Sequence, residues 1–153
     1  MNSRRLAGEI VRDVPRLVED DTVEDAVRSM LDSGLPALPV TDAGGRLRGI
    51  FGEREFMAAL FPGYVGQLGY AAFVPKTLDD AIERRATCRS ETAGAHMNTE
   101  HVDVGADFSD LQLVEIFLHH HVLIVPVTEE GQLIGLVTRA DFFREIARKF
   151  ISS

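Results

Sequence analysis

The chain has 153 residues, and its 24 acidic side chains outnumber 16 basic ones to give a formal net charge of −8. This length suits one compact domain or two small halves that share a core, whereas the acidic charge, without a stripe of Lys or Arg, disfavours nucleic acid as a partner. A single cysteine excludes an internal disulfide, and no apolar run fits a membrane span or a signal peptide, so we expect a cytoplasmic protein without a membrane segment.

The first part of the chain predicts helices around a pair of strands. The arginine-rich segment Ser3–Arg12 is expected to form an amphipathic lead helix that docks on the rest of the protein. Apolar residues at helical spacing predict a helix that follows Thr22 as N-cap and stops at Gly34. A continuous apolar run, Ala37–Thr41, predicts a buried strand, and a glycine turn reverses the chain into a second strand, Leu47–Phe51, followed by a closing helix.

A long insert, Met57–Ala95, separates this unit from the rest of the chain. It contains a turn at Phe61–Tyr64, a short apolar element at Val65–Phe73 and a charged helix at Leu78–Arg89 with Thr77 as N-cap. Structureless loops of such length are uncommon. We therefore expect the insert to pack on its own domain or to form a dimer contact.

The last part of the chain repeats the order of the first. Ser109 is expected to cap a helix, and strands are predicted at Leu123–Thr128 and Leu133–Val137 around a Glu-Glu-Gly turn. Apolar residues on one face predict a closing helix over Arg139–Phe150.

The two units are copies of one another. Pro39–Asp42 recurs 87 residues later as Pro126–Glu129, and beyond the extra Gly45 the match continues at an offset of 86. Each unit alone would expose an apolar sheet face, so we predict an α/β fold in which two βαββα-like units pack through their sheets as a pseudo-twofold pair.

The strand Pro-Val-Thr-Asp/Glu, the glycine turn and the segment Gly-Leu-Val-Thr-Arg-Ala-Asp-Phe that ends at Phe142 together resemble the CBS (cystathionine-β-synthase-type) domain, and two copies resemble a Bateman module. The resemblance divides the chain into a first repeat with its lead helix (1–61), the insert (62–95) and a second repeat (96–153). It implies that clefts between the repeats bind adenosyl compounds, with a Thr hydroxyl at the phosphate and an Asp carboxylate at the ribose.

In this sequence, the resemblance assigns those two roles to Thr138 and Asp141. Asp141 is three positions after Thr138, so at a helix entry both side chains face the same side, where free backbone N–H groups favour an anion. The alternative is that Thr138 is only an N-cap and Asp141 only complements the helix dipole. By position, the remaining predicted ligand-binding residues of this cleft are Asp21, Ala26, Leu35, Pro36, Ala37 and Ile124.

The first repeat departs from the pattern, because Gly52 replaces the threonine and Glu55 replaces the aspartate. This second, degenerate cleft also includes Phe108, Leu113, Val122 and Leu123, and we expect it to be the empty one. Since neither buried strand is preceded by Arg or His, a ligand with little phosphate charge, AMP or S-adenosylmethionine, is favoured over ATP. A contribution from Arg16, Arg54 or Arg139 would reverse that preference.

Metal binding and catalysis find little support in the sequence. Three consecutive histidines, His119–His121, point about 100° apart on a helix and cannot all ligate one ion. The sequence shows no cysteine or carboxylate cluster at ligand spacing, so no metal site is predicted.

Neighbouring arginines would lower the pKa of Cys88, but a free helical cysteine without a role is favoured. No nucleophile motif or phosphate-binding glycine loop with Lys occurs, so we expect no enzyme.

The sequence therefore predicts a stand-alone regulatory module, a homodimer that acts on an unknown regulated protein and requires no cofactor. The candidate ligands are AMP, ADP, ATP, S-adenosylmethionine, NAD and cyclic di-AMP. The alternative is an interaction or structural adaptor whose clefts are vestigial.

Overall fold

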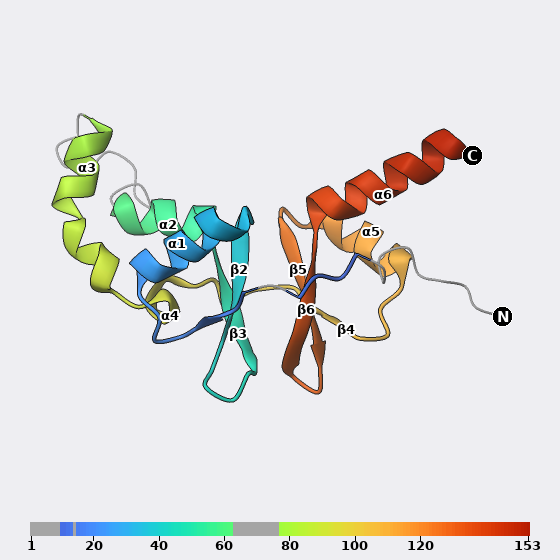
Figure 1. Cartoon of the computed structure of the whole chain (residues 1–153), viewed down its shortest axis with the longest axis horizontal. Helices are drawn as coiled ribbons and strands as arrows, with labels where there is room; N and C mark the ends of the chain where they lie inside the picture. The colour runs from blue at the N-terminus through green and yellow to red at the C-terminus, as the bar shows by residue number, and fades with distance from the viewer. Residues whose placement is uncertain (1–9, 14, 63–76) are drawn as a thin grey trace.

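Two small sheets stand side by side at the centre of the protein, with helices on their outer faces (Figure 1). The structure is a computed structural model, and it describes residues 10–13, 15–62 and 77–153. The predicted turn at Phe61–Tyr64, the apolar element at Val65–Phe73 and most of the lead helix lie partly or wholly outside these residues.

The first repeat runs β1 (Leu17–Val18), α1 (Val23–Ser33), β2 (Ala37–Thr41), β3 (Leu47–Gly52) and α2 (Glu53–Leu60). Strand β2 lies between β1, its parallel neighbour, and β3, its antiparallel one. The hydroxyl of Thr22 accepts from the Asp25 amide at 3.1 Å, and Gly34 ends α1 with a φ of 70° that a side chain would disfavour. Both predicted helix signals are thus confirmed.

The segment between the repeats contains α3 (Leu78–Arg84), the 3₁₀ helix η4 (Ala86–Ser90) and α4 (Ala93–His96). The prediction of one helix over Leu78–Arg89 is wrong in its second half. Helix α3 ends at Arg85, whose guanidinium donates to the carbonyl of Ala59 at 2.9 Å, and the tighter 3₁₀ turn then directs Cys88 into the core of the first repeat.

The second repeat runs β4 (Val104–Gly105), α5 (Asp110–His119), β5 (Ile124–Glu129), β6 (Gln132–Thr138) and α6 (Arg139–Ser152). Its sheet has the same order and the same strand directions as the first. Ser109 caps α5 by accepting from the Gln112 amide at 3.1 Å. The predicted elements of this repeat are present, with ends that differ by one or two residues.

The two sheets pack against each other through side chains from equivalent positions. Ala37 and Ile50 of the first repeat form one buried cluster with Ile124 and Leu136 of the second. At the far end, the two hairpin turns exchange backbone bonds of 3.1 Å, from Leu47 to Gly131 and from Leu133 to Gly45. The predicted α/β pair of repeats, packed through their sheets, is confirmed.

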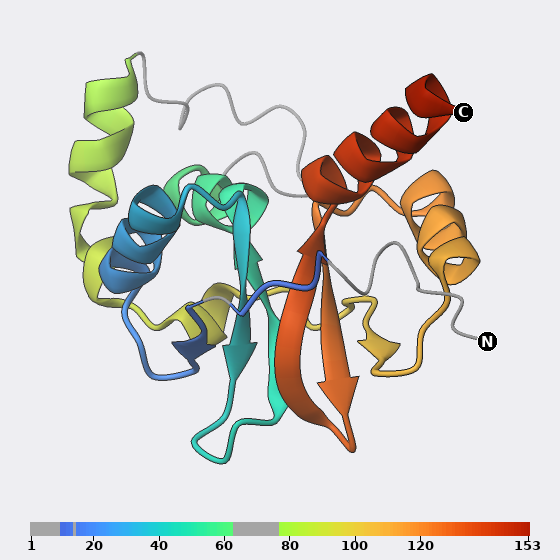
Figure 2. The ribbon, with the colours of Figure 1, turned by 45° about the vertical axis from the view of Figure 1, so that its right-hand side comes forward.

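Each sheet also pairs with a segment from outside its own repeat. The segment before the first repeat pairs with the second sheet, and the segment before the second repeat pairs with the first sheet. Arg12 exchanges backbone bonds of 2.8 and 3.0 Å with Leu136 of β6, and Asn98 does the same with Ile50 of β3 at 3.0 and 2.8 Å. Figure 2 shows the N-terminal segment, in blue, crossing from the first sheet to the second. Residues 10–12 are therefore extended, and the prediction of a helix up to Arg12 is wrong there.

Glycine makes these crossings possible. A Cβ on Gly49 would lie 2.8 Å from the carbonyl oxygen of Asn98, and a Cβ on Gly135 would lie 2.8 Å from that of Arg12. Both distances are too short for real atoms, so a side chain at either glycine would push the incoming segment away from the strand. Among the described residues, no helix is long and apolar enough to cross a membrane.

Candidate functional site

Thr138 and Asp141 lie together at the start of α6, as predicted from their spacing. The hydroxyl of Thr138 accepts from the Asp141 amide at 3.0 Å and caps the helix. Both residues are buried, with exposed fractions of 4% and 7%. The local arrangement is thus the one that a helix cap requires.

The Asp141 carboxylate has partners within the protein. Arg12 donates to both oxygens, at 2.6 and 2.8 Å, and Arg144 donates to one of them at 3.0 Å. The hydrogen bond from Arg12 is the main reason why the pKa of Asp141 is lowered from its ordinary value of 3.8. Any ribose hydroxyl that binds Asp141 must therefore compete with a guanidinium for the same oxygens.

The equivalent positions of the first repeat are arranged differently. Gly52 has no side chain to cap α2, and the Glu55 carboxylate instead accepts from the Gly52 amide at 2.8 Å. Asn98 occupies the place that Arg12 has in the other repeat. A Cβ on Gly52 would lie 2.7 Å from that of Ala37, so a threonine does not fit here without movement of β2.

A cleft of about 680 Å³ opens beside Gly52 and Glu55, between the two repeats. We call it the inter-repeat cleft; its lining residues are Pro36, Ala37, Ile50, Gly52, Glu53, Arg54, Glu55, Ala58, His96, Asn98, His101, His121, Val122, Leu123 and Ile124. Its volume falls within the range of small-molecule sites, about 300–1,000 Å³. It is formed by the start of α2, the entry to β5 and the segment around Asn98.

The inter-repeat cleft brings together predicted residues from both sites. Gly52, Glu55, Val122 and Leu123 were assigned to the degenerate cleft, whereas Pro36, Ala37 and Ile124 were assigned to the cleft of Asp141. The carbonyls of Pro36 and Leu123 are already occupied, because they accept from the first amides of α2 and α6 at 3.0 and 2.9 Å. A ligand here would meet side chains and the remaining backbone groups of these segments.

The other predicted residues lie in the protein framework. Ala26 and Leu35 are buried in the core of the first repeat, and Phe108 and Leu113 are buried in that of the second. The Asp21 carboxylate accepts from the Val18 amide at 2.8 Å and closes the turn after β1. These residues hold the elements that carry the cleft.

Four basic side chains line the inter-repeat cleft: Arg54, His96, His101 and His121. Arg54 and the histidine run are notable in the sequence, but the sequence does not show that they line one cleft together with Glu55. The sequence did not identify His96 and His101 as site residues. Their position on either side of Asn98, the residue equivalent to Arg12, would have been the clue. The Nδ1 atom of His101 is buried without a hydrogen-bond partner.

Cys88 is 2% exposed, and its surroundings differ from those expected. Burial has the largest effect on the pKa of the Cys88 thiol and raises it. Glu91 raises this pKa further, and Arg85 lowers it by less. Arg85 does lower this pKa, but the net effect is an increase, so the reactive-thiol alternative considered from the sequence is not supported.

With the fold and the cleft described, the comparisons identify the class of protein. Residues 7–62 and 93–148 match the CBS domain, and the chain belongs to this family. Over 144 residues it is 28% identical to an inosine-5'-monophosphate dehydrogenase from Korarchaeum cryptofilum, covering 93% of this chain but only 24% of that protein.

Solved structures agree with the fold. A protein from Vibrio cholerae described as a putative acetoin utilization protein superposes with a TM-score of 0.72 at 19% identity, covering 95% of this chain and 92% of that one. The protein CBSX2, solved in complex with AMP, superposes with a TM-score of 0.69 at 18% identity, covering 94% and 97%. The chain is thus a tandem pair of CBS domains.

Proposed function

We propose that this chain is a regulatory, non-catalytic module that binds an adenosine-containing mononucleotide, with AMP as the favoured ligand, in the inter-repeat cleft. The observation that carries the proposal is the cleft itself, which both repeats line and whose walls combine apolar residues with Arg54 and three histidines. The AMP complex of CBSX2, a structure with the same fold, supports the same class of ligand.

The side chains of the inter-repeat cleft suit the parts of a nucleotide. Pro36, Val122 and Leu123, which line the cleft and are only partly buried, offer apolar surface to a base. Glu55 is an acceptor for ribose hydroxyls, since a carboxylate has more lone pairs than its one bond to the Gly52 amide uses. Arg54 and the histidines favour a phosphate, which argues for AMP, ADP or ATP over S-adenosylmethionine. Among these three, the AMP complex of CBSX2 favours AMP.

The proposal departs from the cleft that the sequence favoured. Thr138 and Asp141 stay a predicted site, but the bidentate bond from Arg12 to Asp141 makes the Glu55 side the better candidate. A ligand that touches both repeats would regulate by binding one arrangement of them more tightly than another.

Calorimetric titration with AMP, ADP, ATP, S-adenosylmethionine, NAD and cyclic di-AMP tests the proposal. Ala58 lines the cleft from α2, so Ala58→Trp should fill it and abolish binding, and Glu55→Gln should weaken AMP at least tenfold. Asp141→Asn, the equivalent change in the other repeat, is the matched control and should leave AMP binding intact.

Other outcomes have clear meanings. If Asp141→Asn abolishes binding while Ala58→Trp does not, the ligand occupies the Thr138 and Asp141 cleft instead. If no ligand binds at millimolar concentration, the sensor proposal fails and the adaptor function takes its place.

We also propose that two copies of the chain associate through the outer face of the second repeat. The rings of Phe117 on α5 and Phe142 on α6 lie 5.5 Å apart, yet both helices leave large apolar side chains exposed. The exposed ones are Leu111, Leu118, Phe143, Phe150 and Ile151, each at least 70% accessible. A cluster of this kind is typical of an interaction surface.

A further inference from the structure

Cys88, Glu91 and His96 lie together beside the first repeat, and of these three only His96 also lines the inter-repeat cleft. One ligand atom from each residue, Sγ, a carboxylate oxygen and a ring nitrogen, lies within 4.8 Å of the other two. A tetrahedral zinc ion with bonds of about 2.0–2.3 Å separates its ligand atoms by about 3–4 Å. Small side-chain rotations therefore suffice to place one ion between these three atoms.

We propose that Cys88, Glu91 and His96 bind a zinc ion. The set consists of thiolate, carboxylate and imidazole, the three kinds of ligand that zinc takes from proteins. A thiolate selects against magnesium and calcium, which prefer oxygen. Three protein ligands leave a fourth position for water or another group.

The backbone that carries these ligands is fixed before any ion binds. The Glu91 carbonyl accepts from the Val23 amide at 2.8 Å, and the Ala93 amide donates to the Asp21 carbonyl at 2.7 Å. Gly94 approaches β1 so closely that a Cβ would lie 3.0 Å from the Glu19 carbonyl oxygen. The ligands thus come from a short segment that is hydrogen-bonded to the first repeat at Glu91 and at Ala93.

The Glu91 carboxylate already has two partners at the site, and zinc binding would rearrange them. Glu91 now accepts from His96 at 2.6 Å and from Arg85 at 3.2 Å, so one carboxylate oxygen faces two nitrogen groups. If zinc binds, the Cys88 thiol would release its proton to solvent, the proton on the His96 nitrogen that faces Glu91 would move to the other ring nitrogen or to solvent, and the ion would take the place of the bond between Glu91 and His96. Arg85, which is held by the Ala59 carbonyl, remains as the outer partner that orients the carboxylate.

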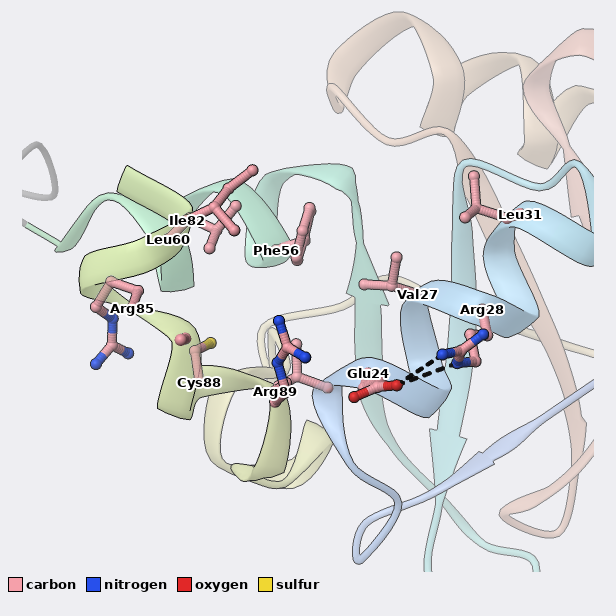
Figure 3. A pocket seen from close by; sticks show the side chains of 12 residues that line it. Glu24, Val27, Arg28, Leu31, Phe56, Leu60, Ile82, Arg85, Cys88 and Arg89 are labelled. Carbon is pink, nitrogen blue, oxygen red and sulfur yellow. Dashed lines mark hydrogen bonds and ion pairs between the residues drawn. The ribbon is translucent and has the colours of Figure 1, made fainter. Parts of the chain in front are cut away.

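An access route reaches the cysteine. A groove of about 350 Å³ between α1, α2, α3 and η4 is lined by apolar residues such as Val27, Phe56 and Ile82, and by Cys88. Figure 3 shows Cys88 on the η4 wall of this groove, between Arg85 and Arg89. The proposal therefore takes this groove as the side from which an ion would approach Cys88, which is 2% exposed.

His96 joins the two sites, because it also lines the inter-repeat cleft. A bound zinc ion would hold the ring through the nitrogen that now contacts Glu91. Zinc occupancy would then fix one wall of the cleft, so that a change in metal loading changes the affinity for a ligand there.

Cobalt titration of the purified full chain is the sharpest test, with Co²⁺ as a coloured substitute for zinc. Cys88 is the single cysteine of the sequence, so a thiolate-to-cobalt charge-transfer band reports this residue alone. We expect one equivalent of Co²⁺ to produce the band together with tetrahedral d–d absorption, and zinc to displace both. Cys88→Ser should remove the band, and Glu91→Gln or His96→Gln should lower the affinity at least tenfold.

His120→Gln is the control, since His120 is an exposed histidine that lines neither the inter-repeat cleft nor the groove beside Cys88, and it should leave the band unchanged. Circular dichroism establishes that each variant is folded, and zinc should raise the unfolding midpoint of the wild type but not of Cys88→Ser. The proposal is overturned if the wild type shows no thiolate band, or if zinc binding survives Cys88→Ser and is lost in His120→Gln. All of these readouts are independent of nucleotide binding.

Discussion

Arg12 and Asp141 are 129 residues apart in the sequence and form a bidentate ion pair across the two repeats. The carboxylate side chain is 10% exposed, whereas the guanidinium side chain is 46% exposed. The pair therefore links the extended segment that precedes the first repeat to the first turn of the last helix.

Replacement of Arg12 by Met should lower the free energy of unfolding by about 1–2 kcal/mol, because it leaves a nearly buried carboxylate with weaker partners. This value is reduced for the solvent exposure of Arg12. Urea denaturation of Arg12→Met, Asp141→Asn and the double variant measures the pairwise term. Additive losses would mean that the two side chains do not stabilise each other.

The same pair predicts a dependence of stability on pH. The pKa of Asp141 is lowered in the folded protein from its ordinary value of 3.8, mainly by the bond from Arg12. A carboxyl group with a lowered pKa adds stability above its unfolded pKa, and this contribution is lost as the pH falls through the folded value. The stability difference between the wild type and Asp141→Asn should be constant near neutral pH and shrink below about pH 4. A gap that stays the same down to acid unfolding would contradict this.

Gly49→Ala should destabilise the protein by about 1–3 kcal/mol, since the new methyl group would meet the Asn98 carbonyl at 2.8 Å. Gly44→Ala is the matched control, because its Cβ meets nothing closer than 3.4 Å. Chemical denaturation gives the free energies. Hydrogen exchange at the amides of Ile50 and Asn98 should rise in Gly49→Ala but not in the control; equal exchange in both would show that the glycine is not needed for the close approach.

The proposed dimer predicts that Phe143→Glu and Phe150→Glu convert the protein to a monomer, because a buried unpaired carboxylate is costly. Light scattering coupled to size exclusion measures the mass. Ile134→Glu, an exposed apolar position on β6 rather than on α6, should leave the mass unchanged. A wild type that is already monomeric would rule out association through this face.

Local signals in the sequence predicted most of the fold. Thr22, Ser109 and Gly34 act through their own backbone neighbours, so their effect is readable without tertiary structure. The end of α3 was not predicted, because Arg85 turns there in response to Ala59 and Glu91, which belong to other elements. The extended path at Arg12 was also missed, since its hydrogen-bond partner is 124 positions away.

The candidate site was harder to predict than the fold. Repeat alignment identified Gly52, Glu55, Thr138 and Asp141, but it carries no information on a side chain without a repeated partner. Arg12 binds the Asp141 carboxylate, whereas the equivalent residue beside Glu55 is Asn98. Because of this one difference, Asp141 is paired with a guanidinium and Glu55 is not paired with an equivalent one among the described residues. Likewise, Cys88, Glu91 and His96 become neighbours only through the 3₁₀ turn.

The crossed pairing of extended segments affects how the chain can fold while it is being synthesised. Domains generally fold from the N-terminus as they emerge, but Arg12 has to wait for Leu136 before its backbone bonds form. The first repeat receives its own extra segment sooner, as soon as Asn98 follows Ile50. Folding on the ribosome would therefore complete the first sheet before the second, and Arg12 would be among the last of the described residues to form its backbone bonds.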